Sequence, residues 1–298
     1  MRSYNPQKGR KVCQGIQLLI LTAPSGSHTV RGVVQHRTNL QLALSDLVEG
    51  VSSVHIWSAL GWQEVMQRYR RSVLGPFWLT ISTALMVGIM GPLYGKLFNQ
   101  DVGTYFAHLA VSLVLWQTIS QIMLDSSIAF IVSDVYIKQV RLPLTIHILR
   151  TLWKNLVILF HNFAVVVIVI IFFRPPLGLA LLLFPLALVI FAANALWVGI
   201  LLGMVCARFR DIPLVVTNVM QVAFFLTPIL WKPEMLGRHA WSVNFNPFFH
   251  FLEIMRAPLL GTPTNALSWA VVATITFAGY ALTIAFYSRF RARIAYWI

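Results

Sequence analysis

Six long apolar stretches occupy the chain from residue 76 to its C-terminal end, and each approaches the length of a membrane span. A helix needs about 20 consecutive apolar residues to cross the hydrocarbon core of a bilayer. Only 11% of all residues are charged, against roughly a quarter in a soluble domain. We therefore expect an all-α integral membrane protein with six transmembrane helices over 76–298. The predicted spans are Phe77–Phe98, Phe106–Val132, Leu142–Phe173 (its most apolar part Leu156–Phe173), Leu177–Cys206, Ile212–Trp231 and Leu267–Tyr287.

The connections between these spans differ in basic residues. One alternating set of connections carries ten basic residues: Arg68, Arg70, Arg71, Lys138, Arg141, Arg208, Arg210, Arg289, Arg291 and Arg293. The other set carries five: Lys96, Arg174, Lys232, Arg238 and Arg256. Because connections rich in Lys and Arg stay in the cytoplasm, we expect both termini on the cytoplasmic side of the inner membrane. The net charge of +14 fits anionic lipid better than nucleic acid, since no soluble segment carries a basic stripe with interleaved aromatics.

Two regions precede the first span. Residues 1–38 are polar and rich in Gly and Ser, and we interpret them as a flexible basic tail. The apolar run Ile16–Thr22 followed by Ala23-Pro24-Ser25-Gly26 weakly resembles a signal peptide, which is the alternative. Residues 39–75 place apolar side chains such as Ile56 and Trp57 against the basic end Arg68–Arg71. This pattern predicts an amphipathic helix lying in the cytoplasmic membrane interface.

The stretch between the fifth and sixth spans is too apolar for a simple loop. Its second half, Phe248–Leu260, is apolar but too short to cross a bilayer. Such segments are typically re-entrant or interfacial, and we expect a re-entrant segment over about 232–261. His250, Glu253 and Arg256 recur every three residues, so we expect them on one helical face with Glu253 paired to Arg256.

Three segments resemble one transporter family. The residues Arg68-Tyr69-Arg70-Arg71-Ser72-Val73-Leu74-Gly75-Pro76-Phe77-Trp78 are similar to the entry of the first span in the permease subunits of type-2 ABC exporters. These exporters move O-antigen, capsule and teichoic acid polymers. Ala207-Arg208-Phe209-Arg210-Asp211-Ile212 also resembles the family. So does Pro228-Ile229-Leu230-Trp231, which leads to Asn246-Pro247-Phe248-Phe249-His250 and Arg256-Ala257-Pro258. The resemblance runs from about Asn39 to the C-terminus.

The resemblance implies a permease domain over 76–298 that works as a homodimer with two separate ATP-binding subunits. ATP and Mg²⁺ would then be bound by the partner, with no cofactor in this chain. It implies a lipid-linked polysaccharide as substrate. A short cytoplasmic helix within Ser133–Pro143 would dock on the ATPase through Lys138, Gln139, Arg141 and Pro143. The segment 232–261 would form an external gate containing His250, Glu253 and Arg256. We expect Arg68, Tyr69, Arg70 and Arg71 at the cytoplasmic mouth.

The residues themselves add chemical constraints. The chain contains no Walker A pattern, since Gly91-Pro92-Leu93-Tyr94-Gly95-Lys96 has the wrong spacing and no following Ser or Thr. It also contains no metal-ligand spacing. Sugars have flat CH faces that suit aromatic rings, so we select as channel-lining candidates, with the membrane-interface belt as the alternative, Tyr105, Phe106, Trp116, Trp231, Phe245, Phe248 and Phe249. Polar residues inside spans could bond to neighbouring helices or contact substrate; these are Asp125, His161, Asn162, Asn194 and Asn218.

Several alternatives remain open from the sequence. A permease for a small molecule or drug would share the same span pattern. A membrane-embedded glycosyltransferase would need carboxylates poised at a membrane face, often as Asp-x-Asp, and this pattern is absent among the nine acidic residues. An ion channel would need a charged ring or a filter loop. His250 and Glu253 could form an acid–base pair, and the basic segment around Lys138 could be an ordinary cytoplasmic loop. We expect a permease without catalytic residues of its own.

Overall fold

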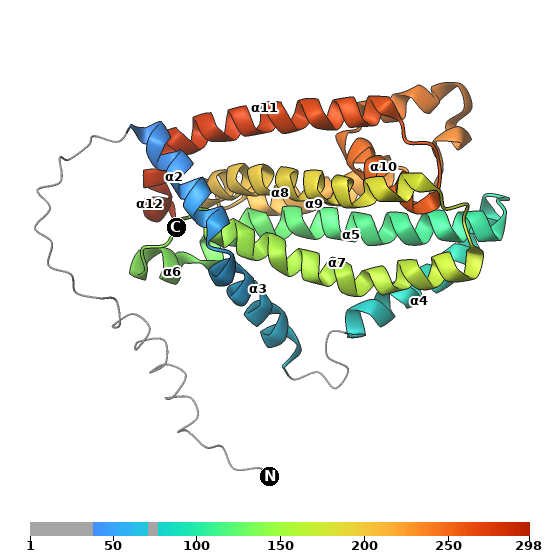
Figure 1. Ribbon diagram of the computed structural model, residues 1–298, viewed down its shortest axis with the longest axis horizontal. Helices are drawn as coiled ribbons and strands as arrows, with labels where there is room; N and C mark the ends of the chain where they lie inside the picture. The colour runs from blue at the N-terminus through green and yellow to red at the C-terminus, as the bar shows by residue number, and fades with distance from the viewer. Residues whose placement is uncertain (1–37, 71–76) are drawn as a thin grey trace, which may run out of the picture. The chain divides into compact units, whose positions relative to one another are not determined.

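The computed structural model describes residues 38–70 and 77–298, and all regular structure in these ranges is helical (Figure 1). The tail expected over 1–38 lies outside these ranges except for Thr38. The long helices are α4 (Phe77–Leu97), α5 (Val102–Val132), α7 (Thr145–Phe173), α8 (Leu183–Arg208), α9 (Ile212–Leu226) and α11 (Ala266–Phe290). The shorter elements are α2 (Asn39–Ser52), α3 (Val54–Tyr69), α6 (Asp134–Gln139), η1 (Leu179–Leu182), η2 (Pro233–Phe245), α10 (Pro247–Leu260), η3 (Arg291–Arg293) and α12 (Ile294–Trp297).

Helix α5 lies at the centre of the bundle and packs against α4, α7, α8, α9 and α10. It begins earlier than the predicted Phe106 because the carboxylate of Asp101 caps it, accepting a hydrogen bond from the Thr104 N–H at 2.9 Å. The same bond lowers the pKa of the Asp101 carboxyl. Most residues of α5 are buried, including Leu109, Leu113 and Phe130. A helix whose apolar residues extend around most of its circumference is expected to be surrounded by others, which explains its position.

Five helical segments are long and apolar enough to cross a membrane: Phe77–Leu97, Val102–Val132, Thr145–Phe173, Leu179–Arg208 and Ala266–Trp297. They coincide with five of the six predicted spans. The remaining span was predicted over Ile212–Trp231, but α9 ends at Leu226. Thr227 precedes Pro228, and the residue before a proline disfavours helical geometry. At 1.5 Å per residue, α9 is about 22 Å long, shorter than a hydrocarbon core of about 30 Å. The count of six spans therefore stays a prediction.

The break after α9 frees backbone carbonyls, and side chains from two other helices satisfy them. The Tyr105 hydroxyl of α5 donates to the Leu230 carbonyl at 2.6 Å, and Arg256 Nη1 of α10 donates to the Pro228 carbonyl at 2.8 Å. Non-helical backbone at membrane depth requires such partners.

The segment 232–261 folds as η2 followed by α10, with a break in η2 at Gly237, whose φ is +54°. Asn246 caps α10 by accepting from the Phe248 N–H at 2.9 Å. Helix α10 ends at Gly261, whose φ is +67° and where a Cβ would overlap the Pro176 carbonyl. Helix α10 packs against α5, α8 and α11. Its 14 residues span about 21 Å, too little to cross a bilayer, and its re-entrant course stays a prediction.

The region predicted as amphipathic contains two helices, α2 and α3, separated at Ser53. Thr38 and Gln41 form a capping box at the start of α2. Helix α3 packs along α7 at Gly61, where a Cβ would lie 2.8 Å from the Arg150 carbonyl oxygen. Their position in the membrane interface stays a prediction.

Elements from separate parts of the chain meet at one end of the bundle, where α2, α6 and α12 lie (Figure 1). Lys138 Nζ donates to the Ile298 carbonyl at 2.9 Å, and Arg210 Nη2 donates to the Trp297 carbonyl at 3.4 Å. Basic residues from different connections of the predicted cytoplasmic set therefore share this end, which we call the α6 end.

One buried carboxylate, that of Asp46, holds the α6 end together. Its Oδ1 accepts from the Thr145 N–H at 3.1 Å, the Thr145 hydroxyl at 2.7 Å and the Tyr287 hydroxyl at 2.7 Å. Its Oδ2 accepts from the Leu144 N–H at 3.1 Å and from Arg291 Nε and Nη2 at 2.9 and 2.7 Å. Asp46 thereby fastens α2 to the N-terminus of α7 and to the end of α11. A carboxylate at a helix N-terminus also offsets the helix dipole.

Replacing Asp46 by Ala should lower the free energy of unfolding by about 3 kcal/mol, because the Arg291 charge and several buried donors lose their partner. Thermal unfolding of the purified protein in detergent measures this. Glu49→Ala is the matched control, since Glu49 is an exposed carboxylate on the same helix. Equal unfolding temperatures for the two variants would contradict the role of Asp46.

Candidate functional site

A polar cavity of about 450 Å³ lies between α4, α5 and α7. Its lining includes the residues Ser82, Thr83, Gln117, Thr118, Ser120, Gln121, Asn155 and Asn162, together with the apolar residues Leu79, Met86, Leu113, Trp116, Ile158 and Phe224. Gln117 and Gln121 are four residues apart on α5, and Asn155 and Asn162 are seven apart on α7, so each pair shares a helix face. Thr83 donates to Gln117 Oε1 at 3.2 Å. Polar side chains within spans usually face protein or water, and here they face this cavity.

A second hollow, the aromatic groove, has a volume of about 810 Å³ and lies along α9, η2 and the start of α10. It brings together Trp231, Phe245 and Phe248, three of the predicted channel-lining residues, with Phe225 of α9. The groove also contains the amides Asn218 and Asn246. The Phe245 side chain is 77% exposed.

Aromatic rings in edge-to-face and tilted contact lie between the polar cavity and the aromatic groove. The Trp116 ring centroid lies 6.1 Å from that of Phe224 and 5.5 Å from that of Phe248. Phe224 and Phe225 lie 5.2 Å apart. Trp116 and Phe224 line the polar cavity, whereas Phe225 and Phe248 line the groove. The bundle thus presents amide groups and aromatic faces side by side.

Other predicted lining residues lie elsewhere. Tyr105 is fully buried in the core. Phe106 packs against Phe173, with ring centroids 5.0 Å apart. Phe249 lines a third cavity of about 900 Å³ at the end opposite α6. The structure therefore places none of the three at the polar cavity or the aromatic groove.

The predicted pair of Glu253 and Arg256 is present, and it borders the third cavity. Arg256 also donates to Ser112 Oγ at 3.1 Å and lies 3.4 Å from His108 Nε2. The prediction that His250 shares a helical face with Glu253 and Arg256 is wrong. The His250 ring contacts Ser268 Oγ and the Asn244 carbonyl at 3.0 and 2.8 Å instead.

The separation of His250 follows from helix geometry. Three residues advance about 300° around a helix, so six residues drift by about 120°. Both ring nitrogens of His250 are occupied by groups other than Glu253, and the geometry provides no acid–base pair. In the described ranges 38–70 and 77–298, no cluster of three His, Cys, Asp or Glu side chains could hold a metal ion.

The residues predicted to contact a partner lie at the α6 end. Lys138 forms a half-exposed pair with Asp134 at 2.7 Å, and Gln139 and Arg141 are exposed. Pro143 is partly buried just before α7, and Arg70 is exposed at the end of α3. The side chains of Arg68 and Tyr69, and the whole of Arg71, lie outside the described residues.

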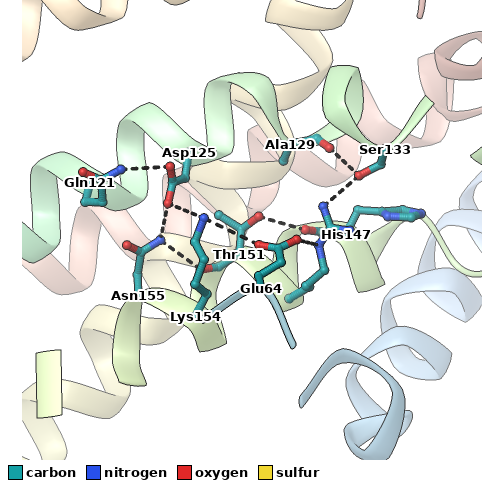
Figure 2. Close-up of polar contacts among 10 residues, drawn as sticks. Glu64, Gln121, Asp125, Ala129, Ser133, His147, Thr151, Lys154 and Asn155 are labelled. Atoms are coloured by element: carbon teal, nitrogen blue, oxygen red, sulfur yellow. Dashed lines mark hydrogen bonds and ion pairs between the residues drawn. The ribbon is translucent and has the colours of Figure 1, made fainter. Parts of the chain in front are cut away.

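A partly buried charge network joins α3, α5 and α7, and Glu64, Asp125, Arg150 and Lys154 form it. Figure 2 shows Glu64, Asp125 and Lys154. Glu64 pairs with Arg150 at 2.8 Å and with Lys154 at 3.6 Å. Lys154 pairs with Asp125 at 2.7 Å. Arg150 also donates to Ser133 Oγ at 3.0 Å. Two positive and two negative groups therefore balance within the network.

The charge network extends to the wall of the polar cavity through Asp125. Gln121 Nε2 donates to Asp125 Oδ1, and Asn155 Nδ2 donates to Asp125 Oδ2, each at 2.9 Å. The sequence singled out Asp125 but gave it no charged partner. Arg150 and Lys154 are four residues apart within a predicted span, and this spacing of two bases was the available signal for a buried acidic partner.

Of the other polar residues within spans, two form hydrogen bonds within the bundle and two line a cavity or groove. Asn194 Nδ2 of α8 donates to Thr276 Oγ1 of α11 at 2.8 Å, which confirms a bond between helices. His161 Nδ1 bonds the Val157 carbonyl of its own helix at 2.8 Å. Asn218 and Asn162 instead line the aromatic groove and the polar cavity, respectively.

Lys154→Met should destabilise the protein by about 2 kcal/mol, because it leaves Asp125 without its ionic partner. The double variant Lys154→Met with Asp125→Asn should recover part of this loss, which a cycle of unfolding temperatures in detergent would measure. Lys138→Met is the control, since its half-exposed pair contributes about 0–1 kcal/mol. Strictly additive effects at 154 and 125 would refute the coupling.

Comparison with known proteins agrees with this architecture. Residues 56–260 match the family described as ABC-2 type transporter. The O-antigen export system permease protein RfbA of Klebsiella pneumoniae is 22% identical over 227 residues, which cover 74% of this chain and 85% of that protein. A second Klebsiella pneumoniae protein of the same name is 22% identical over 244 residues, covering 78% of this chain and 91% of that protein.

The members of the matched family form the membrane part of transporters, and a separate subunit hydrolyses the ATP. The family match covers well over half of the chain and includes α3 to α10. Together with the five long apolar helices, it shows that this protein is a multi-pass membrane protein of the ABC-2 type transporter family.

Proposed function

We propose that this chain is the transmembrane subunit of an ATP-driven exporter that moves a lipid-linked polysaccharide, O-antigen or a similar polymer, across the inner membrane. The observation that carries the proposal is the placement of the polar cavity beside the aromatic groove inside an ABC-2 membrane domain. The names of the two Klebsiella pneumoniae relatives support the choice of polymer.

The chemistry of these surfaces suits a glycan. A sugar unit presents hydroxyl groups at its edges and CH groups on its faces. Amides such as Gln117 and Asn218 can bond the hydroxyls, while rings such as Trp231 and Phe248 can stack on the faces. Neither contact selects one sugar strongly, so a polymer could slide past successive units.

We propose a homodimer with two ATP-binding subunits. Helix α5 fills the centre of the described bundle, so an extended glycan would pass along a lateral face that a second copy completes. ATP and Mg²⁺ would be bound by the partner subunits, and this chain would have no catalytic residues.

The α6 end would face the cytoplasm, in agreement with the basic residues gathered there. Both termini would be cytoplasmic, residues 1–38 a tail, residues 39–75 the interface region and residues 76–298 the permease domain. Arg68–Arg71 would line the mouth near anionic headgroups. The third cavity, with the Glu253–Arg256 pair, would belong to an external gate within 232–261.

Helix α6 would transmit the motion of the ATPase. It is a short helix between α5 and α7 with exposed Lys138, Gln139 and Arg141. Through Ser133, which bonds Arg150 at 3.0 Å, the start of α6 is joined to the charge network. A displacement of α6 would therefore reach α3, α5 and α7 together.

Deleting the gene should abolish surface polysaccharide while polymer accumulates inside on its lipid carrier. Fractionation of the cells locates the polymer in the deletion strain and in a strain that carries the gene on a plasmid. Complete absence of polymer would favour an enzyme of synthesis instead. An unchanged surface would favour a smaller substrate.

Changing Lys138 and Arg141 together to Glu should reduce co-purification of the ATP-binding subunit and lower export at least about tenfold, because both exposed charges are reversed. Lys96→Glu with Arg238→Glu makes the same charge change on exposed residues away from α6 and should leave co-purification intact. Normal association and export in the first variant would disprove the coupling role.

A further inference from the structure

Four exposed arginines gather around two aromatic rings at the α6 end. They lie at the end of α8, in the connection after it, near the end of α11 and in η3, and they are Arg208, Arg210, Arg289 and Arg293. The two rings belong to Phe290 and Trp297, and their centroids lie 5.9 Å apart. We call the four arginines, together with Phe290 and Trp297, the arginine cluster.

Contacts between guanidinium groups and rings hold the cluster together. The guanidinium carbon of Arg208 lies 6.0 Å from the centroid of the Trp297 ring. Those of Arg289 and Arg293 lie 5.8 and 5.7 Å from the centroid of the Phe290 ring. Because the two rings touch each other, the ends of α8 and α11 bring like charges onto one small surface.

No carboxylate balances the cluster within residues 38–70 and 77–298. The ion pairs in those ranges involve other basic residues, and Asp211, the acidic residue that follows Arg210, takes part in none of them. Residues 1–37 and 71–76 contain no acidic residue. The counter-charge of the four arginines must therefore come from solvent ions or from a ligand.

An apolar pocket of about 380 Å³ lies between α5, α8, α10 and α11. Its lining on α8 runs from Phe191 to Val205, about 21 Å along the helix axis. The polar groups in this lining satisfy each other, since Trp197 Nε1 donates to Asn194 Oδ1 at 2.8 Å. A pocket without free polar groups has no partners for water, and its elongated lining suits a hydrocarbon chain.

The pocket and the cluster share one face of α8. Val198, Leu201 and Val205 line the pocket at spacings of four and three residues, and Arg208 continues this series. Val205 is 37% exposed, so the pocket reaches the surface at that residue. Arg208 lies about 4.5 Å further along the helix axis. A molecule with a chain in the pocket would thus place its polar end at the arginines.

A phospholipid with an anionic headgroup matches both features. Free phosphate would use the charge and leave the pocket empty, whereas a neutral lipid would leave the arginines without a counter-charge. Guanidinium groups form strong charge-assisted hydrogen bonds to phosphate oxygens. Basic pockets between transmembrane helices on the cytoplasmic side bind anionic headgroups, and tryptophan is typical of the headgroup region. An acidic protein surface would account for the charge alone.

We propose that the arginine cluster and the apolar pocket together bind an anionic phospholipid of the cytoplasmic leaflet. Its phosphate contacts the arginines, and one acyl chain lies between α5, α8, α10 and α11. The bound lipid would link these four helices near the α6 end. This site is separate from the proposed transport path and does not depend on which molecule is exported.

The first test compares three additives on the full-length protein in detergent. They are phosphatidylglycerol, phosphatidylcholine with the same acyl chains, and glycerol 3-phosphate. Because a ligand of the folded state stabilises it, phosphatidylglycerol should raise the unfolding temperature by at least about 3 °C more than the other two. An equal effect of phosphatidylcholine would overturn the role of the arginines, and an equal effect of glycerol 3-phosphate would overturn that of the pocket.

The second test removes one arginine from each helix end. Arg208→Gln with Arg293→Gln should weaken the binding of phosphatidylglycerol at least about tenfold, because charge-assisted bonds to the phosphate are lost. Lys96→Gln with Arg238→Gln is the matched control, since it removes two exposed bases away from the α6 end. Equal affinity of the two double variants refutes the site. If the arginine variant instead keeps the lipid and loses the ATP-binding subunit, the cluster is a protein-docking surface.

The third test blocks the mouth of the pocket. Val205→Trp should weaken the binding of phosphatidylglycerol at least about fivefold, because the indole occupies space that the acyl chain needs. Val189→Trp is the control, since Val189 lies on the same helix, is exposed and does not line the pocket. An affinity that Val205→Trp leaves unchanged would show that the chain lies elsewhere.

A last measurement needs no variant. The wild-type protein is released from bilayers that contain equal amounts of phosphatidylglycerol and phosphatidylcholine, and the lipid that stays bound is identified by mass spectrometry of the intact protein. At least threefold more phosphatidylglycerol than phosphatidylcholine supports the site. Equal retention of the two lipids argues against it, even if the arginine variant does not fold.

Discussion

The Asp46 carboxylate connects elements that are far apart in the sequence, and the arrangement at the α6 end depends on it. It receives donors from the start of α7 and from the end of α11 while lying on α2. Helices α2 and α3 have exposed apolar faces and limited core contact of their own. Helix α3 is also held to α7 by the Gly61 contact and by the pairs of Glu64 with Arg150 and Lys154, whereas Asp46 supplies the charged contacts of α2. Because α3 carries Glu64, the same anchor also sets one side of the charge network.

The bundle separates polar groups by helix face. Helix α5 carries Gln117, Gln121 and Asp125 toward α4 and α7. In lipid, a polar face must be covered by protein, ions or water-soluble material. The charge network covers the part nearest α6, and a cavity remains beyond it.

Much of the fold could be predicted from the sequence. Apolar length placed five spans to within a few residues of their ends, because the bilayer imposes one length scale on every helix. The end of α9 was missed although Pro228 was visible, since apolar residues continue through Ile229 and Leu230. Three of the seven channel-lining candidates, Trp231, Phe245 and Phe248, lie together in the aromatic groove because they are near one another in the chain. Their contact with a glycan stays a prediction.

Contacts between distant residues were not predictable in this way. In the sequence, Asp46 is one more polar residue on a predicted amphipathic helix, and no neighbouring residue predicts that it is buried. Asn155 was not singled out at all, because its hydrogen bond to Asp125 joins two helices that are far apart in the sequence. The separation of His250 from Arg256 follows from the helical period, but the partners of His250, Ser268 and the Asn244 carbonyl, could be identified only once α10 was placed among its neighbours.

The interrupted end of α9 has a mechanical consequence. Arg256 reaches from α10 to the Pro228 carbonyl and to Ser112 of α5. It therefore joins α10, α5 and the turn after α9. If α10 were displaced alone, Arg256 would keep its pair with Glu253 on the same helix but lose its bonds to Ser112 and to the Pro228 carbonyl. The penalty for sliding α10 is therefore much larger than that for moving it as one body with the chain turn after α9. Any opening at this end of the molecule should therefore carry α10 and the turn after α9 together.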